Sequence, residues 1–187
     1  FRTGSLARDR SYAPDARARA EERLRQLEGR LDTVTPVRFE LALAQVVALA
    51  DNAHTIVPPQ TRPRRYNRVP VRIATLGDGF WVLRASDANA DLLGARLVSI
   101  DGRPVSELRD SSRTLVSGPP HRRDRFASVL LESPDQLHAM GLSRDSSRAT
   151  YVFRTRDERA VSRRLAGEAP ASVGSRVATA RPLSPAW

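Results

Sequence analysis

The sequence predicts an α+β fold in which a pair of helices precedes a small β/α module. Apolar residues recur at helical spacings in the first quarter of the chain, whereas from about residue 66 they alternate along short runs that end at turn-forming residues. The 187 residues are enough for one ordinary domain or two small ones. We expect a loose start, a helical pair, a linker, the β/α module, a region of helices and a hairpin, and a disordered tail, at residues 1–13, 14–57, 58–65, 66–118, 119–167 and 168–187.

The helical pair is predicted from two periodic segments. The first helix begins near Pro14 and runs to about residue 31. The second begins at Thr35-Pro36, an N-cap followed by proline at the first helical position, and it is apolar around most of its circumference. Such a helix must be covered by another part of the protein. The apolar face of the first helix carries Ala20, Leu24, Leu27 and Leu31, and one side of the second carries Phe39, Leu43, Val46, Val47 and Ala50.

The β/α module is predicted from alternating residues and turn signals. Gly77-Asp78-Gly79 and Asp101-Gly102 are turns that follow extended runs. Residues 66–118 are expected to hold strands at 69–73, 80–83 and 97–100 and helices at 87–93 and 104–116.

Prolines and a hairpin pattern delimit the rest of the chain. Pro58-Pro59 and Pro63 mark the linker, and beyond Gly167 the composition loses all periodicity, which predicts disorder. Between them, helices are expected at 121–131 and 133–141, and a hairpin at 150–155 and 160–165.

The basic residues exclude several kinds of chemistry. All 31 of them are arginine, so the chain cannot supply the amine of a Schiff base, a phosphate-loop lysine or a serine/lysine dyad. The absence of cysteine excludes disulfides and thiolate nucleophiles. The longest apolar run, residues 41–50, is about half the ~20 residues of a membrane-spanning helix, so no membrane span is expected. No secretory signal is visible at the start.

The net charge of +10 raises the possibility of a nucleic-acid partner, but its distribution argues against one. The excess lies in residues 58–77, with five arginines and no acid, and in residues 149–187. Only Tyr66 is close to the first group, whereas base stacking needs several interleaved aromatics. We interpret this group as a solvated arginine-rich linker. Nucleic-acid binding is kept as a third hypothesis, in which affinity falls steeply with salt.

Four ordered motifs resemble the amino-terminal part of the tail-specific, or carboxyl-terminal-processing, serine peptidases. They are the Asp51, His54, Thr55 group after an apolar helix, residues 78–82, residues 92–105, and residues 133–142. The run from Gly94 to Val105 is the most specific, because it resembles the strand, Ile-Asp-Gly turn and helix of bacterial PDZ-like domains. The resemblance covers about residues 15–165.

The resemblance implies a helical cap at residues 14–57 and a PDZ-like module at residues 66–118. The family's catalytic serine and lysine lie in a later α/β domain that this sequence does not contain. We therefore expect a fragment or truncated relative that is inactive alone, with no catalytic residue and no cofactor. Export to the periplasm or beyond is implied by the resemblance alone.

A PDZ-like module captures an extended peptide or a protein C-terminus by strand addition. The resemblance makes Gly77, Asp78 and Gly79 the loop that holds the terminal carboxylate, and Phe80, Trp81 and Val82 the edge strand. The Asp78 charge opposes a carboxylate there, and a plain hairpin turn explains the same residues equally well. Phe80 and Trp81 must point to opposite faces of the strand, one toward the core and the other toward a groove or interface. The alternative function is a stand-alone PDZ-like binding module, and the oligomeric state is left open.

His54 is the histidine with the most suggestive neighbours. Asp51 and His54 have the composition of an orienting acid and a base, with Ser86 or Ser99 as conceivable nucleophiles. The preferred interpretation is structural: a partly buried imidazole that ties the end of the cap helix to the next strand, beside Thr55. Three scattered histidines lack the spacing of a metal site, so no metal is expected.

Overall fold

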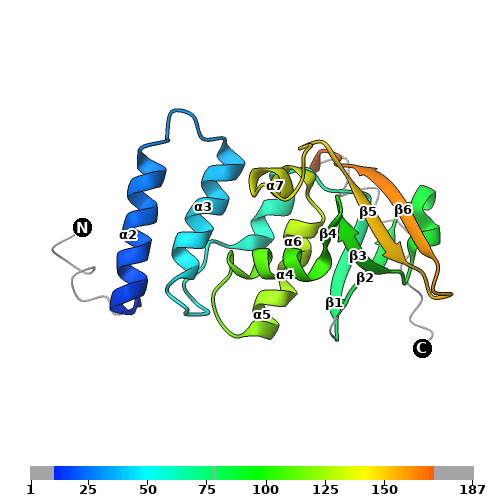
Figure 1. Cartoon of the computed structure of the whole chain (residues 1–187), viewed down its shortest axis with the longest axis horizontal. Helices are drawn as coiled ribbons and strands as arrows, with labels where there is room; N and C mark the ends of the chain where they lie inside the picture. Colours follow the sequence, from blue (N-terminus) through cyan, green and yellow to red (C-terminus); the bar gives the residue numbers. More distant parts are fainter. Residues whose placement is uncertain (1–10, 78, 171–187) are drawn as a thin grey trace.

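The computed structural model describes residues 11–77 and 79–170, and these residues form the α+β fold that the sequence predicts (Figure 1). Two helices stand at one end, and a second group of short helices lies between them and an antiparallel sheet. No helix within these ranges is long and apolar enough to cross a membrane. The predicted loose start and disordered tail fall largely on residues 1–10 and 171–187, which lie outside the described residues.

The helical pair consists of α2 (Pro14–Glu28) and α3 (Pro36–Ala48), which pack against each other. Thr35 caps α3 as predicted, because its hydroxyl accepts the Arg38 amide at 3.4 Å. The predicted apolar face of α2 is wrong in part: Ala20 is buried, but Leu24 and Leu31 are 43% and 52% exposed. The helix ends at Glu28, before the face is complete.

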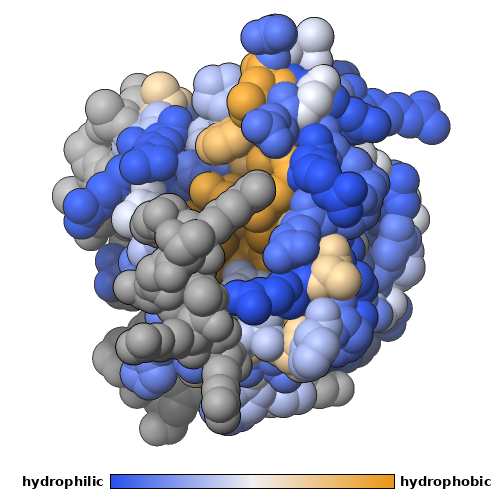
Figure 2. Space-filling model, turned by 90° about the vertical axis from the view of Figure 1, so that its left-hand side faces the viewer, coloured by the Kyte–Doolittle hydropathy of each residue, from blue (hydrophilic) through white to orange (hydrophobic). Residues whose placement is uncertain are grey.

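The inward face of α3 also differs from the prediction. Val37, Leu41 and Ala44 are buried, whereas Phe39 is 36% exposed. The sequence could not select the face because the helix is apolar on nearly every side. Figure 2, which looks onto this end of the molecule, shows apolar atoms among hydrophilic ones.

The sheet has the order β1-β2-β3-β5-β6, with neighbouring strands antiparallel and β4 paired to β3. The predicted hairpin at 150–165 is therefore part of the same sheet as the predicted PDZ-like module. Register shifts interrupt the pairing between Arg72 and Ile73 in β1 and between Leu97 and Ser99 in β3. The strands are β1 (Val71–Leu76), β2 (Gly79–Ala85), β3 (Arg96–Ile100), β4 (Arg103–Pro104), β5 (Arg148–Arg154) and β6 (Ala160–Ala166).

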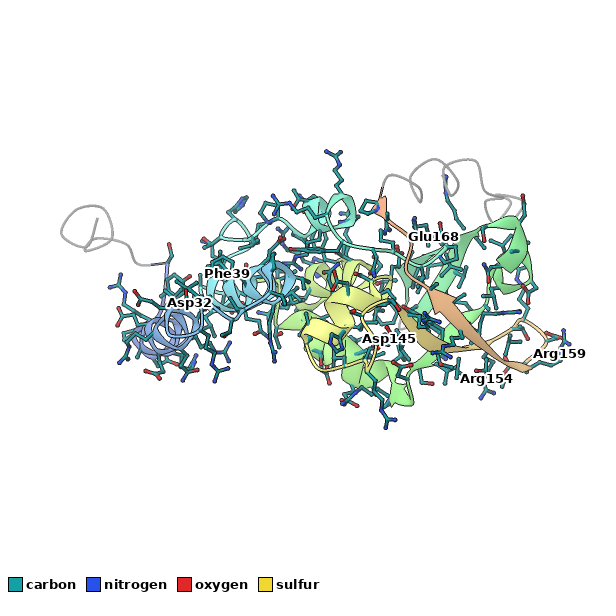
Figure 3. All side chains as sticks on the ribbon, turned by 90° about the horizontal axis from the view of Figure 1, so that it is seen from above. Asp32, Phe39, Asp145, Arg154, Arg159 and Glu168 are labelled. Atoms are coloured by element: carbon teal, nitrogen blue, oxygen red, sulfur yellow. The ribbon has the colours of Figure 1, made fainter. Side chains whose placement is uncertain are left out.

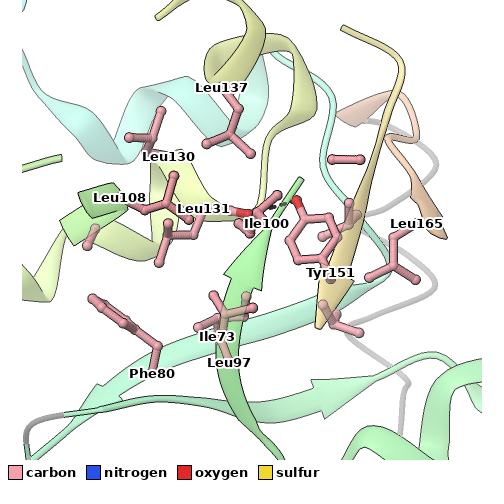
Figure 4. Close-up of a cluster of buried hydrophobic side chains, with 14 of the residues drawn as sticks. Ile73, Phe80, Leu97, Ile100, Leu108, Leu130, Leu131, Leu137, Tyr151 and Leu165 are labelled. Carbon is pink, nitrogen blue, oxygen red and sulfur yellow. Dashed lines mark hydrogen bonds between the residues drawn. The ribbon is translucent and has the colours of Figure 1, made fainter. Parts of the chain in front are cut away.

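Short helices cover one face of the sheet and enclose the core (Figure 4). Phe80, Ile100 and Tyr151 from the strands meet Leu108 and Leu131 from the helices, and all five are buried. The Tyr151 hydroxyl donates to the Leu131 carbonyl at 2.8 Å, which satisfies the one polar atom that this side chain brings into the core. The helices are α4 (Val105–Arg113), α5 (Pro120–Arg125), α6 (Ala127–Leu131) and α7 (Pro134–Ala139).

Two predicted helices are broken in the structure. The helix expected at 121–131 is divided into α5 and α6 at Phe126, whose φ of −95° and ψ of 0° depart from regular α-helical values. The helix expected at 87–93 is a 3₁₀ segment, η2 (Asp87–Leu92), with a kink at Asn89. Gly94 follows it with φ +74°, as expected for a helix stop.

The predicted linker is an ordered part of the body. It forms a second 3₁₀ segment, η1 (Pro59–Arg64), that packs on α6, and Arg62 in it is only 1% exposed. The predicted disorder of the tail is wrong at its start, because Glu168 pairs with Arg68 through two backbone hydrogen bonds of 3.0 and 2.9 Å.

Candidate functional site

The predicted carboxylate loop lies at the tip of the β1–β2 hairpin. Leu76 and Gly79 are paired across the turn, and Gly77 has φ +59°, a conformation that glycine adopts without strain. Asp78 lies outside the described residues. Phe80 is fully buried and Trp81 is half-buried on the opposite face of β2, so the two residues do point to opposite faces.

The prediction that Phe80, Trp81 and Val82 form an edge strand is wrong. β2 lies between β1 and β3, and Trp81 pairs with Ala74 on one side and with Arg96 on the other. Strand addition needs an unpaired edge. In this sheet the strand that ends the order on this side is β1.

The unpaired edge of β1 faces α5 and α6 across an open groove of about 740 Å³. The Ile73 amide points away from β2, because it donates to Glu132 Oε1 at 2.7 Å. Since backbone groups alternate along a strand, Thr75 turns its amide to the same edge. His121, Asp124, Arg125 and Ser128 form the helical wall, and we call this space the β1-edge groove.

A basic hollow continues the β1-edge groove toward the start of β1. Its volume is about 680 Å³, and it shares Arg125 and Ser128 with the groove. Its lining contains four arginines and no acid, namely Arg64, Arg68, Arg72 and Arg125. In the groove itself the one acid, Asp124, is held by Arg113 through hydrogen bonds of 2.7 and 2.9 Å. The hydrogen bonds from Arg113 lower the pKa of Asp124, so this carboxylate is ionised and already engaged.

Among the arginines of residues 58–77, Arg64 and Arg65 are exposed, as predicted for a solvated linker, whereas Arg62 is buried and Arg68 and Arg72 are partly buried. Glu40 of α3 accepts a hydrogen bond from Arg65 at 3.0 Å and one from the Tyr66 hydroxyl at 2.8 Å. Arg62 lies beneath them, with its Nε 3.4 Å from Glu40 Oε1. We call these four residues the cap joint, because they connect the helical pair to the body.

A second buried glutamate holds the start of β1. Glu132, at the end of α6, is 1% exposed and pairs with Arg68 and, at 3.5 Å, with Arg72. Its carboxylate accepts the Ile73 amide and its carbonyl accepts the Val69 amide at 2.8 Å. We call Glu132, Arg68, Arg72 and Ile73 the edge joint.

Burial disfavours the charged forms of both Glu132 and Arg72 in the edge joint. It raises the pKa of Glu132, although Arg68 and Arg72 act in the opposite direction. It also lowers the pKa of Arg72, to about 10. The arginines of the two joints thus neutralise internal carboxylates.

Asp51, His54 and Thr55 lie in the loop that follows α3, and the prediction for His54 is wrong in one respect. The imidazole is exposed, not partly buried. The loop is held by other groups: Ser117 Oγ lies 2.6 Å from the Asn52 carbonyl and 2.9 Å from the Thr55 carbonyl. Asp51 forms an ion pair with Arg123 of α5.

A serine, histidine and aspartate do meet elsewhere, but without the geometry of a catalytic triad. The Ser143 hydroxyl donates to Asp101 at 2.7 Å, while His138 Nδ1 lies 3.1 Å from the Ser143 carbonyl. The imidazole therefore does not face the hydroxyl that it would have to deprotonate. Across residues 11–77 and 79–170, no three His, Cys, Asp or Glu side chains cluster in a way that could hold a metal ion.

Comparisons with known proteins identify the fold. No family model and no curated protein matches the chain. Solved structures of CPAF, a chlamydial serine protease of the tail-specific type, do match, among them mature CPAF complexed with lactacystin and a serine-to-alanine mutant. The chain shares its fold with part of CPAF. These two structures each match with a TM-score of 0.51 and 16% sequence identity, and the match covers 79% of this chain but only 28% of the CPAF chain.

The groove residues His121, Arg125 and Thr75 were not identified from the sequence. Alternation places residues on the two faces of a strand, but it does not show which edge of the strand is paired. The nearest signal was the helix expected at 121–131, whose polar residues could have been considered as a wall next to the first strand.

Proposed function

We propose that this chain is the non-catalytic peptide-recognition and cap region of a tail-specific-type serine peptidase, and that the β1-edge groove receives the peptide. The observation that carries the proposal is an unpaired strand edge that faces a helical wall, in a fold shared with part of CPAF. A strand beside a helix is the arrangement that binds extended peptides by strand addition.

The peptide adds to β1 beyond the edge joint. Glu132 already occupies the Ile73 amide, so the next outward position, Thr75, is the first that pairs with a peptide backbone. Thr75 also braces the wall, because its hydroxyl donates to the Asp124 carbonyl at 2.8 Å. Peptide side chains then alternate between the groove and solvent, which gives the site its side-chain preference.

The direction of the peptide follows from the charges. A peptide that adds antiparallel to β1 runs toward Val71, so its carboxyl end points to the basic hollow. Arg64 and Arg125 line that hollow and are exposed. A guanidinium group matches a carboxylate in shape and charge. Arg64 and Arg125, rather than the amides of the Gly77 turn, thus hold the terminal carboxylate.

Peptide-bond hydrolysis is a property of the parent enzyme in this proposal. The chain contains no lysine, so the dyad that the resemblance implies has to be completed by residues outside it. Incubation of the chain with a fluorogenic peptide and a serine-directed probe should give neither turnover nor labelling. Labelling of a serine in these 187 residues would show that the chain is itself an enzyme.

Peptide titration with the full chain tests the groove. The probes are fluorescein-labelled peptides with a free or an amidated carboxyl terminus, and we expect the free form to bind roughly tenfold more tightly, since a hydrogen bond to a charged group contributes about 1.5–3 kcal/mol. Arg125→Ala should remove most of this preference, whereas Arg84→Ala, an exposed arginine on β2, should not. Equal affinity for the free and the amidated peptide would contradict the proposal that the hollow binds a terminal carboxylate.

A backbone substitution provides a second, matched test. Thr75→Pro deletes the outward amide, and proline is tolerated where a strand amide faces away from the sheet. Thr75→Val keeps that amide and loses only the hydroxyl bond to Asp124. Strand addition requires that the proline variant lose peptide binding while the valine variant retains it. Identical binding by both would place the peptide elsewhere.

A further inference from the structure

A second groove lies on the face of the sheet that carries Trp81, opposite the buried Phe80, and Val105 at the start of α4 also contributes to its lining. Its volume is about 830 Å³, and it is open to solvent along one side. Leu76, Trp81 and Val98 from three adjacent strands form its floor, and arginines from β3, the end of β5 and the β5–β6 turn also line it. We call it the outer groove. Arg154, which lines it, and Phe39 of the helical pair are at opposite ends of the molecule in Figure 3.

The floor of the outer groove is apolar and accessible. Leu76 is 51% exposed and Val98 is 37% exposed, and they are two of the five exposed large apolar residues in the described part of the chain. The open face of an antiparallel sheet usually carries polar residues. Contiguous apolar surface with a polar rim is typical of a protein interaction site.

The side chains of the outer groove are held in place. Trp81 donates its indole N–H to the Leu76 carbonyl at 3.2 Å, and the Arg96 guanidinium lies 6.0 Å from its ring centroid. A Cβ at Gly79 would lie 2.7 Å from Trp81 Nε1 and 3.0 Å from Arg96 Nε. A Cβ at Gly94 would lie 2.7 Å from Arg156 Nε. The two glycines therefore leave the space in which the tryptophan and both arginines lie across the sheet.

The outer groove is lined by more positive than negative side chains, which favours an acidic ligand. Its lining contains Arg96, Arg154 and Arg156 but only one acid, Glu158, which pairs with Arg154 at 3.2 Å. A second copy of the chain, with its net charge of +10, would bring further positive charge to this surface. A small molecule is usually enclosed over most of its surface, whereas this groove is open to solvent along one side. Tryptophan and arginine are the residues that most often dominate protein interfaces.

We propose that the outer groove docks an acidic, apolar segment of a partner protein. Apolar side chains of the segment cover Leu76, Trp81 and Val98, and its carboxylates pair with the surrounding arginines. This site is independent of the β1-edge groove, since Trp81 and the buried Phe80 project from opposite faces of β2.

Fluorescence anisotropy with the full chain tests the docking. The probe is a fluorescein-labelled ten-residue peptide in which leucine and glutamate alternate, acetylated and amidated so that it offers no terminal carboxylate to the β1-edge groove. The control peptide has glutamine in place of glutamate. We expect the acidic peptide to bind at least tenfold more tightly than the control, with an affinity that falls as salt increases.

Matched variants locate the binding site. Leu76→Glu should abolish binding, whereas Leu31→Glu, at an almost equally exposed leucine (52% against 51%), should leave it unchanged. Arg154→Gln should weaken binding several-fold, and Arg84→Gln, on the same sheet but outside the groove, should not. These positions are exposed, so the variants are expected to fold, and circular dichroism checks this.

Three results would overturn the proposal. One is equal affinity for the acidic and glutamine peptides, and another is binding that survives Leu76→Glu. The third is evidence for a different occupant of the outer groove. Self-association that Leu76→Glu abolishes would indicate a second copy of the chain. Co-sedimentation with phosphatidylglycerol vesicles, without peptide binding, would indicate a lipid surface.

Discussion

The cap joint and the edge joint use the same chemistry in two regions of the molecule. In each, a buried glutamate from a helix meets two arginines from residues 58–77. The edge joint is closed: Glu132 is 1% exposed, and its carboxylate also accepts the Ile73 amide. The cap joint is more open, since the Arg65 side chain is 63% exposed and Arg62 Nε and Nη2 are buried without a hydrogen-bond partner among the described residues.

The comparison indicates that the effect of losing a buried ion pair on stability depends on which elements the pair connects. Glu132 connects α6 to the first strand of the sheet, so its loss disturbs the core of the fold. Glu40 connects the helical pair to the body, so its loss can be confined to the region that it attaches. Regions of one protein open with different free energies, and the two joints should report two of them.

The largest effect is expected from Glu132→Ala. It leaves the partly buried Arg68 and Arg72 without their carboxylate and the Ile73 amide without an acceptor. Removal of one partner of a buried pair costs about 3–5 kcal/mol, which is a large part of the stability of an ordinary domain. Urea denaturation followed by circular dichroism measures the loss. Glu22→Ala, which removes an exposed carboxylate paired with Arg25, is the control and should cost less than about 1 kcal/mol. Similar urea midpoints for Glu132→Ala and Glu22→Ala would contradict the conclusion that the edge joint contributes more to stability than an exposed ion pair does.

A smaller and more local effect is expected from Glu40→Ala. Arg65 returns to water, so only Arg62 and Tyr66 lose a buried partner, and we expect a cost of about 1–3 kcal/mol. Hydrogen exchange should become faster in α2 and α3 while β3 and β5 remain protected.

Glu40→Gln, which keeps an acceptor for the Tyr66 hydroxyl, should reproduce only part of this change. If Glu40→Ala instead accelerated hydrogen exchange uniformly across the sheet, loss of the cap joint would destabilise the whole fold and not only the helical pair.

The smallest effect concerns alkaline pH and belongs to the cap joint. Burial, with a further contribution from Glu40, raises the pKa of Tyr66 to about 12. The unfolded chain releases this proton near the ordinary value of 10.0, so the unfolded state is favoured as pH rises from about 10 to about 12. The free energy of unfolding should fall over this interval by less in Tyr66→Phe than in the wild type. Tyrosinate absorbance checks the titration directly, and an ordinary pKa for Tyr66 would remove the Tyr66 contribution from the cap joint.

Much of the fold could be predicted because local signals decide it. The turns at Gly77 and Gly102 have positive φ, and Thr35 and Ser133 cap their helices as their positions before proline indicate. The face of α3 could not be predicted, because Phe39 and Leu41 are equally apolar and only the position of the neighbouring helices distinguishes them.

The candidate site was predicted less well, because it depends on strand order. The alternation that placed Phe80 and Trp81 on opposite faces is a local property, whereas the position of β2 inside the sheet depends on contacts between distant segments. Arg62 shows the same limit: next to prolines it has the composition of a solvated linker, but a glutamate 22 residues earlier in the chain takes it into the interior.

The loop after α3 is attached to the helical wall of the β1-edge groove. Arg122 donates to the Ala53 carbonyl at 2.7 Å, and Arg123 pairs with Asp51, while their neighbours His121 and Arg125 line the groove. The loop that follows the helical pair is thus connected to α5 by a hydrogen bond and an ion pair. We expect any displacement of the loop after α3 to reach α5 through these contacts, and therefore to alter the wall of the β1-edge groove.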